Sequence, residues 1–328
     1  NIIGAAFIGS HVTDTIRNNI ISPDVLGNSD LAMTGALAAL LSAAMWVSFA
    51  TWRSLPVSTT HSVVGAMIGF GIVAGGLSMV NWIKLGAIVM SWIISPVFSL
   101  IISYVMFKTI VRLILIRSQS YKAALRLSPF FIGIAVFIVV MSFVFKTPLG
   151  ASLNLTTPVA GAISLLLALL AGFGGRRLLA RSFGSRAERD AESIFRRIQI
   201  GTSCYVALAQ GANDVANAIG PLALIYFLVK TGEVGPKVPV PFFLLLFGGI
   251  GIAMGVAMGG RRVIQTVGER ITALTNTRGF SVDFAAATTV LLASKLGLPV
   301  STTHAAVGGV LGVGLAGGIE AVNFAIVF

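Results

Sequence analysis

The chain has 328 residues, of which 10% are charged and 56% are hydrophobic, and its formal net charge is +12. A soluble globular domain carries about 25% charged residues, so this composition excludes a soluble protein and predicts a polytopic membrane protein. The basic residues fall in short segments between apolar stretches, which is typical of cytoplasmic loops and argues against a nucleic-acid partner. The single cysteine, Cys204, excludes an intramolecular disulfide framework and a cysteine-cluster metal site.

Apolar segments that are long enough to cross or enter a bilayer recur along the whole chain, since a crossing helix needs about 20 residues. They cover residues 31–52, 56–80, 85–107, 129–145, 158–173, 200–229, 241–259 and 281–316, and residues 1–10 look like the end of another. We therefore expect an all-α membrane helix bundle in a lipid bilayer. Prolines and polar residues interrupt two segments, at Pro56–His61 and Pro299–His304, which predicts broken or re-entrant half-helices.

The charges of the loops predict the orientation of the bundle. Residues 108–126 hold five basic residues and no acid, and residues 176–197 hold seven arginines and three acids. Two apolar segments separate these loops, so both lie on one side, which the positive-inside rule makes cytoplasmic. Residues 261–278, with four arginines and one acid, are expected on the same side.

A hexapeptide is repeated letter for letter in the two halves of the chain. Pro56-Val-Ser-Thr-Thr-His61 recurs as Pro299-Val-Ser-Thr-Thr-His304, at an offset of 243 residues, and matching glycines follow both copies. This match predicts an internal duplication. Residues 12–30 carry a net charge of −2 and their counterpart, residues 261–278, a net charge of +3. Since the first is expected outside and the second inside, we predict halves of inverted topology, as in many secondary transporters.

The duplication divides the chain into three parts. Residues 1–107 are expected to form the first inverted repeat, residues 108–198 the linking transmembrane helices and basic loops, and residues 199–328 the second repeat. The chain starts at Asn1 without a methionine and ends at Phe328 inside an apolar run. Both repeats are therefore expected to be incomplete, the first at its N-terminal side and the second at its C-terminal side.

Each copy of the hexapeptide places three hydroxyl side chains beside a proline. Proline suits the first turn of a helix, and Ser or Thr caps the free N–H groups there. These amides and the positive end of the helix dipole bind anions, so we predict an oxyanion site at two helix starts. The alternative is a pair of capped, kinked helices whose hydroxyls bond to the preceding turn. The hydroxyl residues are Ser58, Thr59, Thr60, Ser301, Thr302 and Thr303.

One acid and two amides lie in the middle of the segment 200–229: Asn213, Asp214 and Asn217. An aspartate inside the bilayer costs about 2.5–3.5 kcal/mol on insertion scales, and these side chains supply oxygens that suit a hard cation. The helix is expected to break and expose carbonyl groups at Gly211, Gly220 and Pro221. The alternative is a polar contact that holds neighbouring helices together.

The two groups of residues constrain the substrate together. A phosphoryl group carries a charge of about −1.5 to −2, and Asp214 would repel it strongly at low dielectric constant. No Arg or Lys lies within the hydroxyl motifs or the Asp214 motif. We therefore expect transported cations to supply the countercharge, which amounts to symport. The oxygen-rich cluster favours sodium, and protons stay an alternative.

Other chemistry has little support in the sequence. His61 and His304 occupy matched positions, where a structural histidine is favoured over a proton relay. Ser301 has no base with an orienting acid beside it, so we expect no enzyme activity. The histidines have no ligand spacing, so we expect neither a cofactor nor a metal other than transported sodium. Four tryptophans are expected to be interfacial anchors or packing residues: Trp46, Trp52, Trp82 and Trp92.

The motif Gly211-Ala-Asn-Asp-Val-Ala-Asn-Ala-Ile-Gly-Pro221 and the two hexapeptides resemble the inorganic phosphate transporter (PiT) family. The resemblance covers nearly the whole chain apart from a basic loop near residues 174–195. It implies phosphate uptake coupled to sodium or protons by a homodimer of inverted-repeat bundles in the plasma or inner membrane. It also implies a phosphate site and a sodium site. The phosphate site would comprise Ser58, Thr59, Thr60, Ser301, Thr302, Thr303, Asn213 and Asp214, and the sodium site Asp214, Asn213, Asn217, Thr59 and Thr302.

The family carries a Gly-Ala-Asn-Asp motif in each half, and this chain has one. The repeat offset therefore predicts a second motif upstream of Asn1. Two other functions stay open. A permease for sulfate or another tetrahedral oxyanion would use the same hydroxyls and helix starts. An anion channel is disfavoured by the fixed carboxylate of Asp214.

Overall fold

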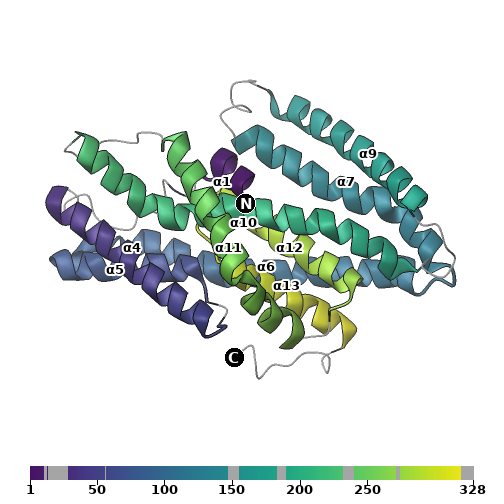
Figure 1. The fold of residues 1–328 in the computed structure, drawn as a ribbon. Coiled ribbons are helices and arrows are strands. Elements are labelled where there is room, and N and C mark those ends of the chain that lie inside the picture. The colour runs from purple at the N-terminus through teal and green to yellow at the C-terminus, as the bar shows by residue number, and fades with distance from the viewer. Residues whose placement is uncertain are drawn as a thin grey trace. The chain divides into compact units, whose positions relative to one another are not determined.

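The computed structural model describes residues 1–10, 13, 29–55, 57–146, 155–182, 190–231, 240–270 and 274–318. All regular elements in these ranges are helical (Figure 1), which confirms the all-α prediction. The N-terminal loop residues 14–28, Pro56 and residues 183–189 of the basic loop lie outside the described residues.

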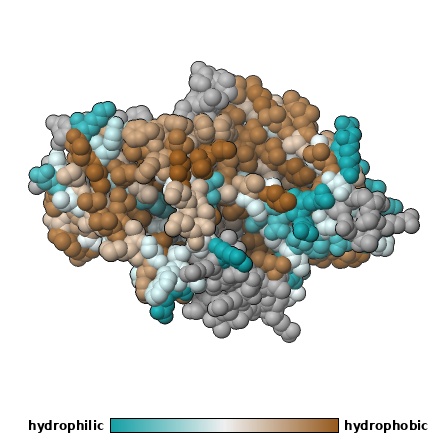
Figure 2. Space-filling view, in the orientation of Figure 1, coloured by the Kyte–Doolittle hydropathy of each residue, from teal (hydrophilic) through white to brown (hydrophobic). Residues whose placement is uncertain are grey.

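Six of the described helices are long and apolar enough to cross a membrane. They are α4 (Ser29–Trp52), α6 (Trp82–Ile110) with the π-helix η2 (Val111–Leu115), α7 (Ser120–Lys146), α9 (Thr157–Ser182), α10 (Ala191–Thr231) and α11 (Phe242–Arg270). Hydrophobic residues cover much of the face in Figure 2, as a protein surrounded by acyl chains requires. The chain is a multi-pass integral membrane protein.

The helices fall into two compact units, and some helices contribute to both. The first unit comprises residues 1–95, 208–267 and 290–304. It holds α1 (Ile2–Ile8), α4, α5 (Thr59–Gly75) and the 3-10 turn η1 (Leu77–Met79), with parts of α6, α10 and α11.

Small residues let the helices of the first unit approach closely. Ala39 and Ala43 of α4 pack against Val64 and Met67 of α5, and these two helices lie side by side in Figure 1. Gly248 of α11 leaves room for side chains of α10. As a result the middle of α10 is buried, including its polar residues.

The second unit comprises residues 96–207, 268–289 and 305–328. Here α7 and α9 form a hairpin (Figure 1) in which a Cβ at Gly172 would meet the backbone of Pro129. An aromatic cluster joins α7, α10 and α12 (Asn276–Lys295), because the rings of Phe131, Phe195 and Phe280 lie with centroids 5.2–5.6 Å apart.

The predicted breaks fall at both hexapeptides. The single apolar segment 281–316 is two helices, α12 and α13 (Thr302–Gly317), and a separate helix, α5, begins at Thr59. With 17 and 16 residues, α5 and α13 are shorter than the about 20 residues that a full crossing needs. The prediction of half-helices is therefore confirmed.

The predicted break at Gly211, Gly220 and Pro221 is wrong. Helix α10 runs without interruption from Ala191 to Thr231 and contains Pro221. Proline removes one hydrogen bond from a helix, and neighbouring helices tolerate this loss in a membrane protein.

Candidate functional site

Serine side chains cap both half-helices. The backbone N–H of His61 donates to Ser58 Oγ at 3.2 Å, and the N–H of His304 donates to Ser301 Oγ at 3.1 Å. Ser58 has the extended backbone (φ −82°, ψ 117°) of an N-cap residue. The predicted capping by the hexapeptides is thus confirmed, and each helix still presents other free amides near its start.

The two hexapeptides contact each other reciprocally. Thr60 Oγ1 donates to the carbonyl of Val300 at 3.1 Å, and Thr303 Oγ1 donates to the carbonyl of Val57 at 3.4 Å. Both donors and both acceptors are related by the repeat offset of 243 residues. The contact therefore has the two-fold pattern that a duplicated element gives when its copies meet face to face.

Asn213 fixes α10 to the second hexapeptide. Its Nδ2 donates to the carbonyl of Val300 at 2.7 Å, and the N–H of Val300 donates to Asn213 Oδ1 at 3.4 Å. This side chain is fully buried. These two bonds satisfy the N–H and the carbonyl of Val300, which have no helical partner at the break before α13.

The carboxylate of Asp214 faces the start of α13. Thr302 Oγ1 donates to its Oδ2 at 3.0 Å, Asn213 Nδ2 donates to its Oδ1 at 2.8 Å, and the side chain of Gln210 also hydrogen-bonds to it. Asp214 is 8% exposed. Within the described ranges no lysine or arginine forms an ion pair with it.

Asn217 reaches the first hexapeptide from one turn further along α10. Its Nδ2 lies 3.1 Å from Thr59 Oγ1 and 3.2 Å from Thr60 Oγ1. Its Oδ1 is buried and has no partner among the described residues. Because Pro221 has no N–H, it also donates nothing to the Asn217 carbonyl. Two oxygens of Asn217 are thus available to a ligand.

The structure brings all the predicted site residues together within the first unit. Asp214 meets the second hexapeptide, Asn217 meets the first, and the hexapeptides meet each other. None of these side chains is exposed. They are Ser58, Thr59, Thr60, Asn213, Asp214, Asn217, Ser301, Thr302 and Thr303.

Sequence reasoning missed the part of Trp92 in this cluster. Its Nε1 donates to the carbonyl of Pro299 at 3.0 Å, and its ring packs against that of His61, with centroids 3.8 Å apart and an interplanar angle of 35°. His61 in turn lies edge-on to His304 at 4.6 Å. Trp92 was predicted to be an anchor or a packing residue. The packing prediction is confirmed, but nothing in the sequence indicates its partners.

The second unit holds another carboxylate, the half-buried Asp283, that no motif indicated. Ser203 Oγ donates to Asp283 Oδ2 at 2.9 Å, and Thr202 Oγ1 donates to the same oxygen at 3.4 Å. These contacts join α10 to α12. They give Thr202 and Ser203 of α10 a polar partner.

Comparisons with known proteins show the family of the chain. The model of the phosphate transporter family matches residues 1–328. Provisionally named phosphate permeases of Pyrococcus abyssi and Thermococcus kodakarensis are 47% and 48% identical to the chain. Their alignments cover 99% and 98% of the chain and 80% and 78% of the relatives.

A solved structure extends the similarity to the fold. It is described as the sodium-dependent phosphate transporter, and it superposes on the chain with a TM-score of 0.90 at 45% identity. The match covers 99% of this chain and 80% of the solved one. With a family model that spans every residue, the chain belongs to the phosphate transporter family.

Proposed function

We propose that this chain is a secondary active transporter that imports inorganic phosphate together with sodium. One observation carries the proposal: the buried carboxylate of Asp214 lies at the start of α13 with hydroxyl and amide partners and no described basic partner. A helix start attracts anions, and a carboxylate attracts cations. Both preferences are satisfied together when an anion and cations bind at the same time.

The phosphate would bind at the starts of α5 and α13. Backbone amides there point away from the helices, and the helix dipoles favour negative charge. Hydroxyls of Thr59, Thr60, Thr302 and Thr303 would donate to phosphate oxygens. Ser58 and Ser301 would shape the two helix starts through their caps. Without a fixed basic residue, the anion is held loosely enough to be released, as transport requires.

The sodium ions would bind between α10 and the hexapeptides. The free Oδ1 and carbonyl of Asn217, the carboxylate of Asp214, the amide of Asn213, and the hydroxyls of Thr59 and Thr302 form an oxygen-rich set. Thr302 Oγ1 donates to the carboxylate of Asp214, and Asn217 Nδ2 donates to Thr59 and Thr60. Sodium would compete with these bonds, and its charge would offset the repulsion between Asp214 and phosphate.

Sodium is favoured over protons by this ligand set and by the similarity to a solved transporter that is sodium-dependent. The reciprocal contact of the hexapeptides supports inverted repeats that move around a shared site. The resemblance to the family also implies a homodimer, which the mass of the detergent-solubilised protein would test. No enzyme activity is proposed.

Uptake into proteoliposomes tests the proposal. Radiolabelled phosphate should accumulate with an inward sodium gradient and not with a pH gradient alone. Asp214→Asn should abolish sodium-driven uptake, because it removes the charge that holds the cation. Asp30→Asn is the matched control, since Asp30 is exposed at the start of α4. Normal uptake by Asp214→Asn would refute the proposed site.

Two competing functions give different results in the same assay. A permease for other tetrahedral oxyanions would be inhibited by sulfate at concentrations similar to those of phosphate. An anion channel would carry phosphate without any cation gradient. We expect weak sulfate inhibition and a strict need for sodium.

A further inference from the structure

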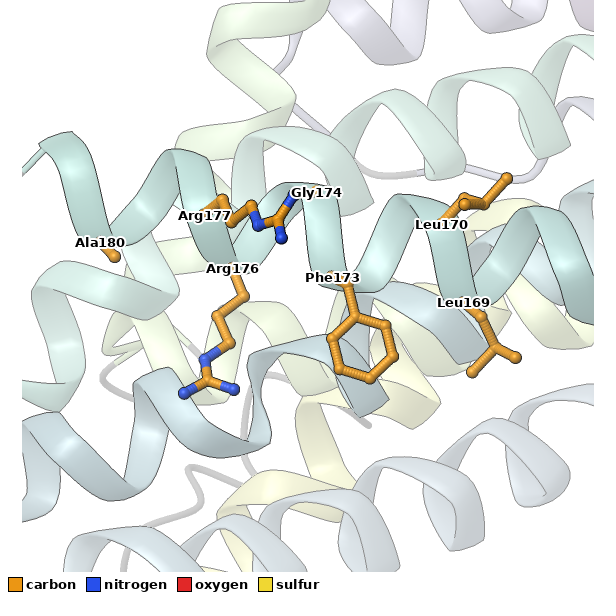
Figure 3. A pocket seen from close by; sticks show the side chains of 7 residues that line it. All are labelled: Leu169, Leu170, Phe173, Gly174, Arg176, Arg177 and Ala180. Atoms are coloured by element: carbon orange, nitrogen blue, oxygen red, sulfur yellow. The ribbon is translucent and has the colours of Figure 1, made fainter.

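One end of α9 carries two arginines beside an open apolar groove. The groove has a volume of about 570 Å³, and its walls include Leu169, Leu170, Phe173, Gly174, Arg176 and Arg177. In Figure 3 Leu169, Phe173 and Arg176 extend to one side of the helix and Leu170 and Arg177 to the other. The charges of the neighbouring loops predict that this end is cytoplasmic.

The apolar part of the groove is exposed. Leu169, Leu170 and Phe173 are 50%, 62% and 55% exposed, and α9 is one of the helices that can cross the membrane. A Cβ at Gly174 would meet nothing within 4 Å, whereas one at Gly175 would meet Ile132 of α7. Gly174 therefore forms a notch in the outer face of α9 and takes no part in the packing of the hairpin.

The two arginines have no countercharge in the described part of the chain. Neither Arg176 nor Arg177 makes an ion pair or hydrogen bond there, and both are exposed. The described carboxylates between α9 and α12 are already engaged. Asp190 Oδ1 accepts the N–H of Ser193 at 2.7 Å, and Glu192 Oε2 accepts the N–H of Thr277 at 3.0 Å.

More positive charge lies at the same end of the hairpin. Because Gly172 packs on Pro129, the exposed residues Lys122 and Arg126 of α7 lie toward the end of α9 that carries the arginines. Basic residues at the cytoplasmic surface of a membrane attract anionic lipids, and the guanidinium group forms paired hydrogen bonds with phosphate. The basic side chains thus suit a phosphate group, and the apolar groove beside them suits an acyl chain.

We propose that this groove binds an anionic phospholipid of the cytoplasmic leaflet. Arg176 and Arg177 hold the headgroup phosphate, and an acyl chain lies along Leu170 and Phe173 over Gly174. The lipid site belongs entirely to the second unit, whereas the candidate transport site belongs to the first. Its existence does not depend on which solute the protein carries.

Native mass spectrometry of the purified protein measures this binding directly, with phosphatidylglycerol and phosphatidylcholine as the probes. The wild type should retain phosphatidylglycerol in preference to phosphatidylcholine. The double variant Arg176→Gln/Arg177→Gln should bind phosphatidylglycerol on the order of thirtyfold more weakly, given the contribution of each basic residue near a membrane surface. Gly174→Leu should also weaken binding, because it fills the notch and leaves the charge unchanged.

The matched control is Lys122→Gln/Arg126→Gln, which removes the same charge from the neighbouring helix α7 and should weaken binding less than the loss of the two groove arginines, because these residues attract the lipid without lining the groove. Equal losses in both double variants would mean diffuse attraction and overturn the site. Unchanged binding by Gly174→Leu would show that the lipid does not lie in the groove. Displacement of the lipid by inorganic phosphate would indicate a free-anion site instead. Disulfide cross-linking of Phe173→Cys between two copies would show that a second chain covers the groove.

Discussion

The indole ring of Trp92 packs against the imidazole ring of His61, with the ring centroids 3.8 Å apart. The same indole donates its N–H to the carbonyl of Pro299. One side chain of α6 therefore contacts both copies of the hexapeptide. This arrangement fixes the distance between the starts of α5 and α13, where the proposed phosphate site lies.

Trp92→Phe tests this positioning role. Phenylalanine keeps an aromatic ring beside His61 but leaves the Pro299 carbonyl without its donor. We expect the KM for phosphate to rise about threefold to tenfold, the effect of one net hydrogen bond, with a smaller change in maximal rate. Proteoliposome uptake over a range of phosphate concentrations measures both. The exposed Trp46 gives the control Trp46→Phe, and equal KM values for the two variants would contradict the role.

Thr302→Val removes the hydroxyl that donates to Asp214 while keeping the shape of the side chain. A hydrogen bond to a charged group is worth about 1.5–3 kcal/mol, and the hydroxyl is also a proposed sodium ligand. The half-saturating sodium concentration for phosphate uptake should therefore rise at least about tenfold.

Thr59→Val should raise the half-saturating sodium concentration less than Thr302→Val does, because Asn217 keeps Thr60 as a second acceptor. Thr34→Val serves as the control, since Thr34 Oγ1 bonds within its own helix on an exposed face. If Thr59→Val has the larger effect, the assignment of Asp214 as the main sodium ligand is wrong.

The reciprocal contact predicts coupling between Thr60→Val and Thr303→Val. Each single variant loses one hydrogen bond between the hexapeptides, worth about 1 kcal/mol, while the other bond still holds the segments together. The double variant loses both and should lower Tm by more than the sum of the single effects. Thermal unfolding in detergent, followed by tryptophan fluorescence, measures the three shifts. Additive shifts would mean that the two bonds are independent.

The glycines that follow the two hexapeptides differ in their surroundings. A Cβ at Gly308 would collide with the backbone of Pro96, whereas one at Gly65, the matched position of the first repeat, would meet nothing within 4 Å. Gly308→Ala should therefore lower Tm by about 5 °C, the effect of overpacking against backbone. Gly65→Ala should leave Tm unchanged or raise it slightly, because alanine favours the helix. A similar loss in both variants would contradict the close approach at Gly308.

Much of the fold and the candidate site could be predicted because their causes are local. An apolar segment of sufficient length predicts a membrane helix without any knowledge of its neighbours. The caps at Ser58 and Ser301 follow from Pro-x-Ser-Thr-Thr patterns alone. The burial of Asp214 follows from its place in an apolar segment. These predictions needed only residues that are close in sequence.

The remaining features depend on contacts between distant residues. Whether Pro221 breaks α10 depends on the helices that pack around it, and here they keep the helix continuous. The partners of Trp92 lie in α5 and before α13, up to 207 residues away. Asp283 has no motif because its partners, Ser203 and Thr202, belong to another helix. Contacts between such distant residues produce no periodic pattern in the sequence.

The contact between the hexapeptides also bears on how this gene could change after its duplication. Each copy supplies a donor to the other and accepts one in return, through Thr60 with Val300 and Thr303 with Val57. A mutation in either copy therefore alters an interface that both copies share, so selection acts on the two as one unit. The six letters are identical in the two halves of the present sequence.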